Sequence, residues 1–343
     1  MSNPHTITSA LVILFFTTTA HATILTVHND PLYNAQYSTI NAAITAASAG
    51  DTLLVHGSPV SYGNFTLTKS LAIIGPGHDP AKGPSASFTL VTLNAGSNGS
   101  QMEGLAINQL TVNAPDVIVR GIRNTVYFTT NSSADGLLVS GCLIVDSYID
   151  IDPGAQNVEV RNCYFSNSSQ NSSQFRSGSA TTLVHSCVFE RSSTSTSTSN
   201  RIFYASTSFP VFADNVFITA TVAAFNPDVC PNYSFQNNLS YSTAGAVVSM
   251  GPNNLDNVAP TWNLASGLTA FNYGDDYNML SGVPLTGASD GGQVGVMGGT
   301  TPLDKAGRPK NVPLVTSTTL LTPYVPVNGT IDVNFQAEQG QPQ

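Results

Sequence analysis

Charged residues are scarce in this chain. Lysine and arginine together number 11, and aspartate and glutamate number 20, so charged side chains make up only 9% of its 343 residues. A soluble domain usually carries about 25% charged residues. Helical bundles and coiled coils need Glu and Lys on their solvent-facing sides, so the deficit argues against both. Because 41% of the residues are hydrophobic, the chain does not resemble a disordered acidic one either. The composition leaves one class, a sheet-rich protein whose surface is hydrated by hydroxyl and amide groups.

Basic residues are the scarcer charged type, and the formal net charge is −9. Nucleic acids and anionic membrane surfaces attract clustered Lys and Arg, so neither is an expected partner. A polyanionic glycan would also be repelled at long range, unless a local basic patch or Ca²⁺ compensated. The composition therefore favours an uncharged or weakly charged extracellular polysaccharide, or a cell-surface glycan, as the partner.

Long hydrophobic runs are absent, apart from one near the start of the sequence. Residues 10–16 (ALVILFF) form an apolar core, and residues 20–22 (AHA) match a small-x-small cleavage site. The run is too short to cross a bilayer. We therefore predict a signal peptide at residues 1–22 and no membrane insertion after its removal. The mature protein is expected to be secreted or at the cell surface, with the periplasm as the alternative.

Imperfect repeats occupy the middle of the chain. Six segments share one pattern, at 117–122 (VIVRGI), 137–142 (LLVSGC), 158–163 (VEVRNC), 182–187 (TLVHSC), 210–215 (PVFADN) and 233–238 (YSFQNN). They are spaced by roughly 20 to 28 residues, which is typical of a solenoid. In the third segment Val158 and Val160 alternate with polar residues, as in a strand. Asn162 would then make a tight turn, because Asn tolerates left-handed backbone geometry. Cys163 would point inward on the next strand.

A third strand precedes each unit, as the segments 110–113 (LTVN), 126–129 (VYFT), 148–151 (YIDI), 175–177 (FRS), 202–205 (IFYA) and 247–250 (VVSM) indicate. Three strands per coil describe a right-handed parallel β-helix, an all-β fold, of eight to ten coils. A short helix within residues 38–50 is expected to cap the open first coil, since an uncovered end would invite aggregation.

Two segments resemble the pectate-lyase-like right-handed β-helix superfamily, and in particular its secreted bacterial members without an assigned activity. They are residues 38–77 (STINAAITAASAGDTLLVHGSPVSYGNFTLTKSLAIIGPG) and the closing 282–302 (GVPLTGASDGGQVGVMGGTTP). The first matches a cap helix followed by strands, and the second matches a terminal coil. With the repeats, the likeness covers about residues 24–303. It implies the fold and export, and it leaves the activity open among lyases, hydrolases, epimerases, adhesins and structural proteins.

The catalytic patterns of the superfamily's enzymes are missing. A polygalacturonase-like site needs paired aspartates and Gly-His-Gly, yet Asp275 and Asp276 lie far from His78 and in the wrong order. A Ca²⁺-dependent lyase needs several carboxylates on neighbouring strands, and no such set exists here. The four histidines after the signal peptide lack metal-ligand spacing. We therefore predict no cofactor, with Ca²⁺ left as an unsupported alternative.

The weak candidates for chemistry are Asp150 and Arg176. Asp150 is expected to point outward from its strand, with Arg176 one coil below, Tyr127 one coil above and Phe203 beyond Arg176. A carboxylate, a guanidinium and two aromatic rings could hold a sugar. The alternative is a surface ion pair beside rings that only pack on their neighbours.

Three cysteines, Cys142, Cys163 and Cys187, fall at the same inward position of successive repeats. Free thiols that pack as small apolar groups are favoured, and a disulfide between neighbouring coils is the alternative. We divide the chain into a signal peptide (1–22), a β-helix with its cap (23–300) and a C-terminal extension (301–343). The extension would pack along the solenoid, cover its end or form a separate strand pair.

The function expected from these patterns is that of a secreted or cell-surface β-helix protein, without catalytic activity, that contacts glycans, mediates adhesion or is structural. The alternative is a polysaccharide lyase or glycoside hydrolase acting on an extracellular glycan, with Asp150 and Arg176 as the residues to test.

Overall fold

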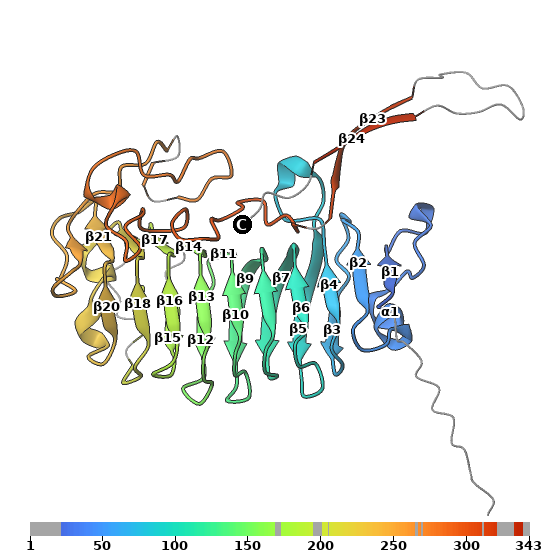
Figure 1. Ribbon diagram of the computed structural model, residues 1–343, viewed down its shortest axis with the longest axis horizontal. Helices are drawn as coiled ribbons and strands as arrows, with labels where there is room; N and C mark the ends of the chain where they lie inside the picture. Colours follow the sequence, from blue (N-terminus) through green and yellow to red (C-terminus); the bar gives the residue numbers. More distant parts are fainter. Residues whose placement is uncertain are drawn as a thin grey trace, which may run out of the picture.

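The computed structural model describes residues 22–168, 173–194, 201–204, 206–264, 267–268, 270–310, 312–320 and 333–338. The predicted signal peptide therefore lies outside the described residues, except for Ala22. Two long parallel sheets make up most of the structure, in the arrangement of a β-helix-like solenoid (Figure 1). The all-β prediction is thus confirmed at this level.

Sheet A contains 10 strands, and every neighbouring pair in it is parallel. Its order is β1 (Ile24–Val27), β2 (Thr52–Val55), β4 (Ala72–Ile74), β6 (Gln101–Glu103), β8 (Ile118–Arg120), β10 (Leu138–Ser140), β13 (Glu159–Arg161), β16 (Leu183–His185), β18 (Val211–Ala213) and β20 (Ser234–Gln236). Each strand is short because the chain turns away after crossing one face of the solenoid.

Sheet B contains 12 strands. Ten of them follow one path: β3 (Asn64–Leu67), β5 (Ala86–Leu93), β7 (Leu105–Val112), β9 (Arg123–Thr130), β11 (Leu143–Val145), β14 (Tyr164–Asn167), β17 (Val188–Arg191), β19 (Val216–Thr219), β21 (Leu239–Ser242) and β22 (Leu255–Asp256). The long strand β9 pairs with β11 through its first residues and with β12 (Ile149–Ile151) through its last ones. β12 pairs in turn with β15 (Phe175–Ser177), so these two strands begin a third face.

Helices are few and short. The α-helix α1 (Ile40–Ala46) begins after Thr39, whose hydroxyl accepts a hydrogen bond from the Ala42 N–H. It buries Ile40, Ala43 and Ile44 and packs against β1, β2 and β3. The 3₁₀ turns are η1 (Pro31–Tyr33), η2 (Pro80–Lys82), η3 (Val222–Ala224), η4 (Pro227–Val229) and η5 (Val283–Leu285).

The interior is built from stacked columns of identical positions, as the repeats predict. Phe165, Phe189 and Phe217 stack on successive strands of sheet B, with ring centroids 4.3 and 5.2 Å apart. Cys142, Cys163 and Cys187 form the neighbouring column, and all of them are fully buried free thiols. The inward cysteine column is therefore confirmed, without disulfides among the described residues.

The residues that turn the chain from sheet A to sheet B form a column of their own. Each adopts a positive φ, namely Gly104 (68°), Gly121 (55°), Gly141 (61°), Asn162 (49°), Ser186 (52°), Asp214 (59°) and Asn237 (55°). Asn162 thus makes the left-handed turn that the sequence predicts. We call this set the turn column.

The chain after β22 does not add a further coil, contrary to the resemblance of residues 282–302 to a terminal coil. The described residues between 258 and 310, which we call the return segment, run back toward the early coils along the turn column (Figure 1). Gly295 donates its N–H to the Asp214 carbonyl (2.8 Å), and His78 donates its N–H to the Ala306 carbonyl (2.8 Å). Between these points Asn162 Nδ2 donates to the carbonyls of Val296 (3.0 Å) and Gly298 (2.9 Å).

The return segment also covers the outer side of sheet B. Tyr164, Val188, Val216, Ile218 and Leu239 point outward from their strands, yet they are buried against Tyr277, Met279, Val294, Val296 and Leu303. The solenoid consequently has two hydrophobic clusters, one inside the coils and one beneath this cover.

The C-terminal extension combines two of the predicted arrangements. Leu303 and Ala306 are buried where the segment packs along the solenoid. Beyond it, β23 (Leu314–Leu320) and β24 (Val333–Glu338) form a separate antiparallel pair that projects away from the coils (Figure 1).

Candidate functional site

The most distinctive polar surface lies on the third face of the solenoid. Strand pairing places Thr129, Asp150 and Arg176 side by side on β9, β12 and β15, all half-buried. The bridge between Phe175 and Phe203 places the next residue, Tyr204, beside Arg176. Two residues before Thr129 and Asp150, Tyr127 and Tyr148 form a parallel outward row. We call Tyr127, Tyr148, Asp150, Arg176 and Tyr204 the tyrosine–arginine face.

The guanidinium of Arg176 lies between two tyrosine rings. Its Cζ atom is 3.7 Å from the ring centre of Tyr148 and 5.4 Å from that of Tyr204. Such cation–π contacts hold an arginine flat and are worth about 0.5–1 kcal/mol at exposed sites. The rings of Tyr127 and Tyr148 are 6.4 Å apart, and the Tyr127 hydroxyl donates to Gln109 Oε1 (3.1 Å). Tyr204 remains 52% exposed, so one aromatic ring faces solvent.

Asp150 is the acidic group of this face. Burial raises the pKa of its carboxyl above the usual value of 3.8, and the charge of Arg176 opposes that rise. Asp152 raises the pKa further, and a hydrogen bond from Ser177 lowers it. Asp152 itself is engaged in its turn, because its Oδ1 accepts from the Gly154 N–H (2.8 Å). The carboxylate of Asp150 therefore has one cation beside it and a second carboxylate that is already hydrogen-bonded to the backbone.

The predicted neighbourhood of Asp150 and Arg176 holds, whereas the aromatic positions are shifted. Thr129, not Tyr127, lies above Asp150, and Tyr127 instead stands beside Tyr148. Phe203 was expected to face outward, and this is wrong: it is 1% exposed and packs among Phe189, Phe212 and Phe217. Tyr204 occupies the outward position. Two residues of this face were missed: Tyr148, which stands two residues before Asp150, and Tyr204, which follows Phe203.

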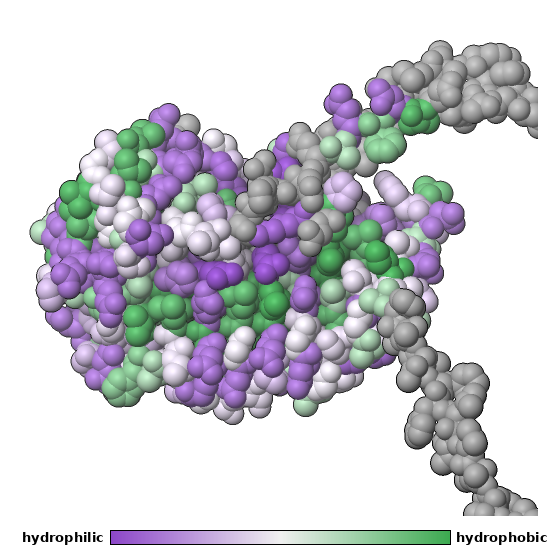
Figure 2. Space-filling view, in the orientation of Figure 1, coloured by the Kyte–Doolittle hydropathy of each residue, from purple (hydrophilic) through white to green (hydrophobic). Residues whose placement is uncertain are grey.

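The outer side of sheet A has a different character. Figure 2 shows a band of hydrophobic side chains across this face. Strand pairing places Ile118 beside Leu138 and Leu183 beside Val211 there, with β13 between the two pairs. Glu159 stands in the same row, and its Oε1 contacts Arg161 Nη1 and His185 Nε2, both at 3.0 Å, in the neighbouring row of outward positions. His185 is thus outward and paired with a carboxylate, as a solvent-facing residue would be.

A second acidic group, Glu190 on β17, lies beneath the cover of sheet B and has no solvent exposure. Its Oε2 accepts a hydrogen bond from the Ser166 hydroxyl (2.6 Å), and its Oε1 has no partner among the described residues. Burial raises the pKa of this carboxyl to about 8. A group without access to solvent cannot contact a polymer, so Glu190 is not part of the candidate site.

Within the described ranges, no group of three or more His, Cys, Asp or Glu side chains is arranged to hold a metal ion. The same residues contain no helix with the length and hydrophobicity that a membrane crossing requires. No protein-family model matches the chain, and a search of curated proteins found no similar sequence. Function must therefore be argued from the site itself.

Proposed function

We propose that this protein is an exported, right-handed parallel β-helix of the pectate-lyase-like superfamily, with α1 as its N-terminal cap, that contacts an extracellular or cell-surface glycan without cleaving it. The parallel sheets and the sequence likeness of residues 38–77 support the fold part of the proposal. The signal-like residues 1–22 support export to the cell surface or medium, with the periplasm as the alternative destination.

The observation that carries the glycan proposal is the tyrosine–arginine face. Sugar rings have apolar C–H faces and hydroxyl edges, so they suit aromatic rings flanked by hydrogen-bonding groups. Tyr204 offers an exposed ring, Arg176 offers several N–H donors, and Asp150 accepts from hydroxyls. Stacking between Tyr148 and Tyr204 orients Arg176 before any ligand arrives, which lowers the entropic cost of binding.

A binding role fits the charges of this face better than catalysis. Hydrolysis of a glycosidic bond commonly uses two carboxyl groups on either side of the bond. The second carboxyl near Asp150 on the described part of this face is Asp152, which belongs to the adjoining turn, where its Oδ1 accepts the Gly154 N–H (2.8 Å), so the two carboxyls do not flank a common site on the strands. One observation favours the enzyme alternative: the raised pKa of Asp150 would suit a general acid of a lyase or hydrolase.

The experiment that tests this proposal is a glycan-array screen of the purified protein, with and without Ca²⁺, followed by a reducing-end assay on each bound glycan. We expect binding without release of reducing ends. Tyr204→Ala and Arg176→Ala should each weaken binding by about tenfold, since each removes a main contact. Tyr33→Ala, which changes another exposed tyrosine at the N-terminal end, serves as the matched control and should have no effect.

Release of reducing ends that Asp150→Asn abolishes would establish the enzyme alternative. Absence of binding to every glycan would leave a purely structural solenoid as the better account.

A further inference from the structure

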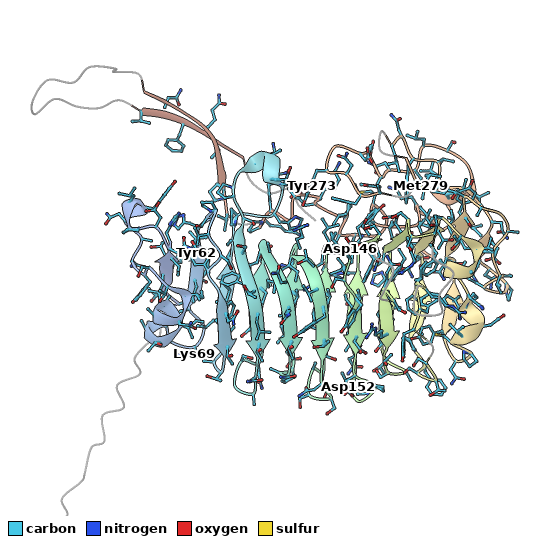
Figure 3. All side chains as sticks on the ribbon, turned by 180° about the vertical axis from the view of Figure 1, so that it is seen from behind. Tyr62, Lys69, Asp146, Asp152, Tyr273 and Met279 are labelled. Carbon is cyan, nitrogen blue, oxygen red and sulfur yellow. The ribbon has the colours of Figure 1, made fainter. Side chains whose placement is uncertain are left out.

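A polar cavity of about 660 Å³ lies away from the tyrosine–arginine face, outside the first strands of sheet B. Its walls come from the turns at Ser58 and Pro84, from Ser87 and Arg123 on β5 and β9, and from Tyr273 of the return segment. Figure 3 labels Tyr273 beside the loop that carries η2. Because these parts are distant in sequence, only the folded chain with its return segment in place creates this cavity.

One wall of the cavity is a hydrogen-bonded pair, His78 and Tyr273. The Tyr273 hydroxyl donates to the His78 carbonyl (3.1 Å), and the same oxygen lies 3.1 Å from His78 Nδ1. Since the hydroxyl has one proton, Nδ1 must carry the ring proton and donate it to the hydroxyl oxygen. Burial, with the charge of Arg123 as the second cause, lowers the pKa of His78 to about 3. The imidazole is therefore neutral and adds no charge to the cavity.

The charge of the cavity comes from Arg123. This side chain is half-buried, lines the cavity, and forms no ion pair with any acidic group in the described part of the chain. Arg120, Arg161 and Arg308, in contrast, each contact a carboxylate. Asp79, whose charge raises the pKa of Tyr273, accepts the Ala81 N–H through its Oδ1 at the start of η2 and forms no ion pair with Arg123 among the described residues. A cation without a counter-charge inside a cavity is unusual in a protein of net charge −9.

We infer that this cavity is a binding site for a ligand that carries one carboxylate group. The planar fork of a guanidinium pairs with a carboxylate through two parallel hydrogen bonds. One arginine balances a single negative charge, whereas a phosphate would bring nearly two. An adjoining cavity of about 520 Å³ shares Ser58, Pro59 and Pro84 with the first, and Tyr62 lines it. It gives room for the remainder of the ligand.

The experiment is calorimetric titration of the purified protein with benzoate, with benzamide, and with inorganic phosphate, all at one ionic strength. Benzamide has nearly the same shape as benzoate but no charge. We expect saturable binding of benzoate, weaker binding of phosphate and none of benzamide. Arg123→Gln should weaken benzoate binding by about tenfold or more, because a charge-assisted pair is lost. Arg120→Gln, which removes a cation on sheet A, is the matched control and should leave binding intact.

A second variant keeps the inference testable if Arg123→Gln does not fold. Ser87→Trp keeps the arginine but fills the cavity, and it should also abolish binding. The inference fails if benzoate does not bind, if benzamide binds as tightly, or if both variants bind as the parent does. Tighter binding of phosphate than of benzoate would overturn the carboxylate assignment. Benzoate carries no sugar ring, and Tyr204→Ala leaves this cavity unchanged while Arg123→Gln leaves the tyrosine–arginine face unchanged, so failure of the glycan proposal and failure of this one are distinguishable.

Discussion

At the scale of single residues, the burial of Glu190 has the clearest energetic consequence. The pKa of its carboxyl rises from 4.5 to about 8, chiefly because burial disfavours the charged form. The Ser166 hydrogen bond opposes this rise, and the nearby Asp146 adds to it. The folded chain therefore holds a proton on Glu190 at neutral pH, which the unfolded chain releases near pH 4.5.

This difference makes stability depend on pH. Between about pH 4.5 and 8 the folded state binds the proton and the unfolded state does not, so the free energy of unfolding falls as pH rises. The stability that the Glu190 proton contributes to the free energy of unfolding is fully present below pH 4.5 and is lost by about pH 8. Its upper bound is about 5 kcal/mol. Glu190→Gln should match the parent at pH 4.5 and exceed it in stability at pH 8. Urea unfolding at both pH values measures this.

Glu159→Gln provides a control, because the stability contributed by the Glu159 carboxylate should change with pH in the opposite direction. The hydrogen bond from His185, together with the charge of Arg161, lowers the pKa of Glu159, so its contribution is present above pH 4.5 and disappears in acid. Equal pH slopes for the parent and Glu190→Gln would contradict the assignment of a protonated carboxyl.

The outward direction of side chains at the candidate site could be predicted only where alternation was unambiguous. In residues 148–151 one aspartate stands between two isoleucines, so its outward direction is fixed. Residues 202–204 are three consecutive large apolar or aromatic side chains, Ile202, Phe203 and Tyr204. They show no alternation from which inward and outward positions could be assigned. A shift of one residue exchanges the two faces of a strand. The surrounding phenylalanines, which no local pattern reveals, decide that Phe203 turns inward.

At the scale of the elements, one interior column changes its chemistry along the solenoid. The position held by Cys142, Cys163 and Cys187 continues as Asn215, Asn238 and Asn254. Asn215 Oδ1 accepts the N–H of Cys187 (2.9 Å), and Asn238 Oδ1 accepts the N–H of Asn215 (2.9 Å). In the cysteine part the sulfur takes over this role, since the N–H of Cys142 points at Cys163 Sγ (3.4 Å). The repeats predicted the column, and these side-chain bonds explain the exchange of residue type.

Asn215→Ala should destabilise the protein by about 3 kcal/mol. The change leaves the buried N–H of Cys187 and the carbonyl of Val184 without their partner, and each unsatisfied group costs roughly 1–3 kcal/mol. Asn215→Cys should cost clearly less, because a sulfur at this position can accept the N–H as it does in the earlier coils. Denaturant unfolding of both variants provides the comparison, and equal losses would contradict the role given to the side-chain acceptor.

At the scale of the whole molecule, the return segment is the feature that sequence periodicity did not reveal. The repeats predicted stacked coils because their contacts recur at a regular spacing. Residues 258–310 have no such spacing, and their contacts join positions far apart in the chain, such as Asn162 with Val296 and His78 with Ala306. The resemblance of residues 282–302 to a terminal coil was a local likeness that could not indicate where these residues pack.

Two truncations should have opposite outcomes. A chain ending at residue 257 loses the cover over Tyr164, Val188 and Val216, so its hydrophobic surface should bind the dye ANS and promote aggregation. Of the described elements, a chain ending at residue 313 loses β23 and β24, which pack on each other, and it should remain folded. Size-exclusion chromatography with ANS fluorescence distinguishes the two. A well-behaved chain ending at residue 257 would show that the cover is dispensable.

The crossing of the return segment over the turn column affects how the molecule as a whole comes apart. A simple stack of repeats is held by contacts between nearest neighbours, so its end coils can unravel while the middle stays intact. Here the same stretch of chain contacts Asp214, Asn162 and Gly121, so it joins late, middle and early coils. At the crossing, an added Cβ on Gly307 would lie 2.3 Å from the Gly121 carbonyl oxygen, so the two backbones touch. Fraying that reaches these coils from either end must first detach the return segment, and unfolding should consequently be far more cooperative than nearest-neighbour stacking allows.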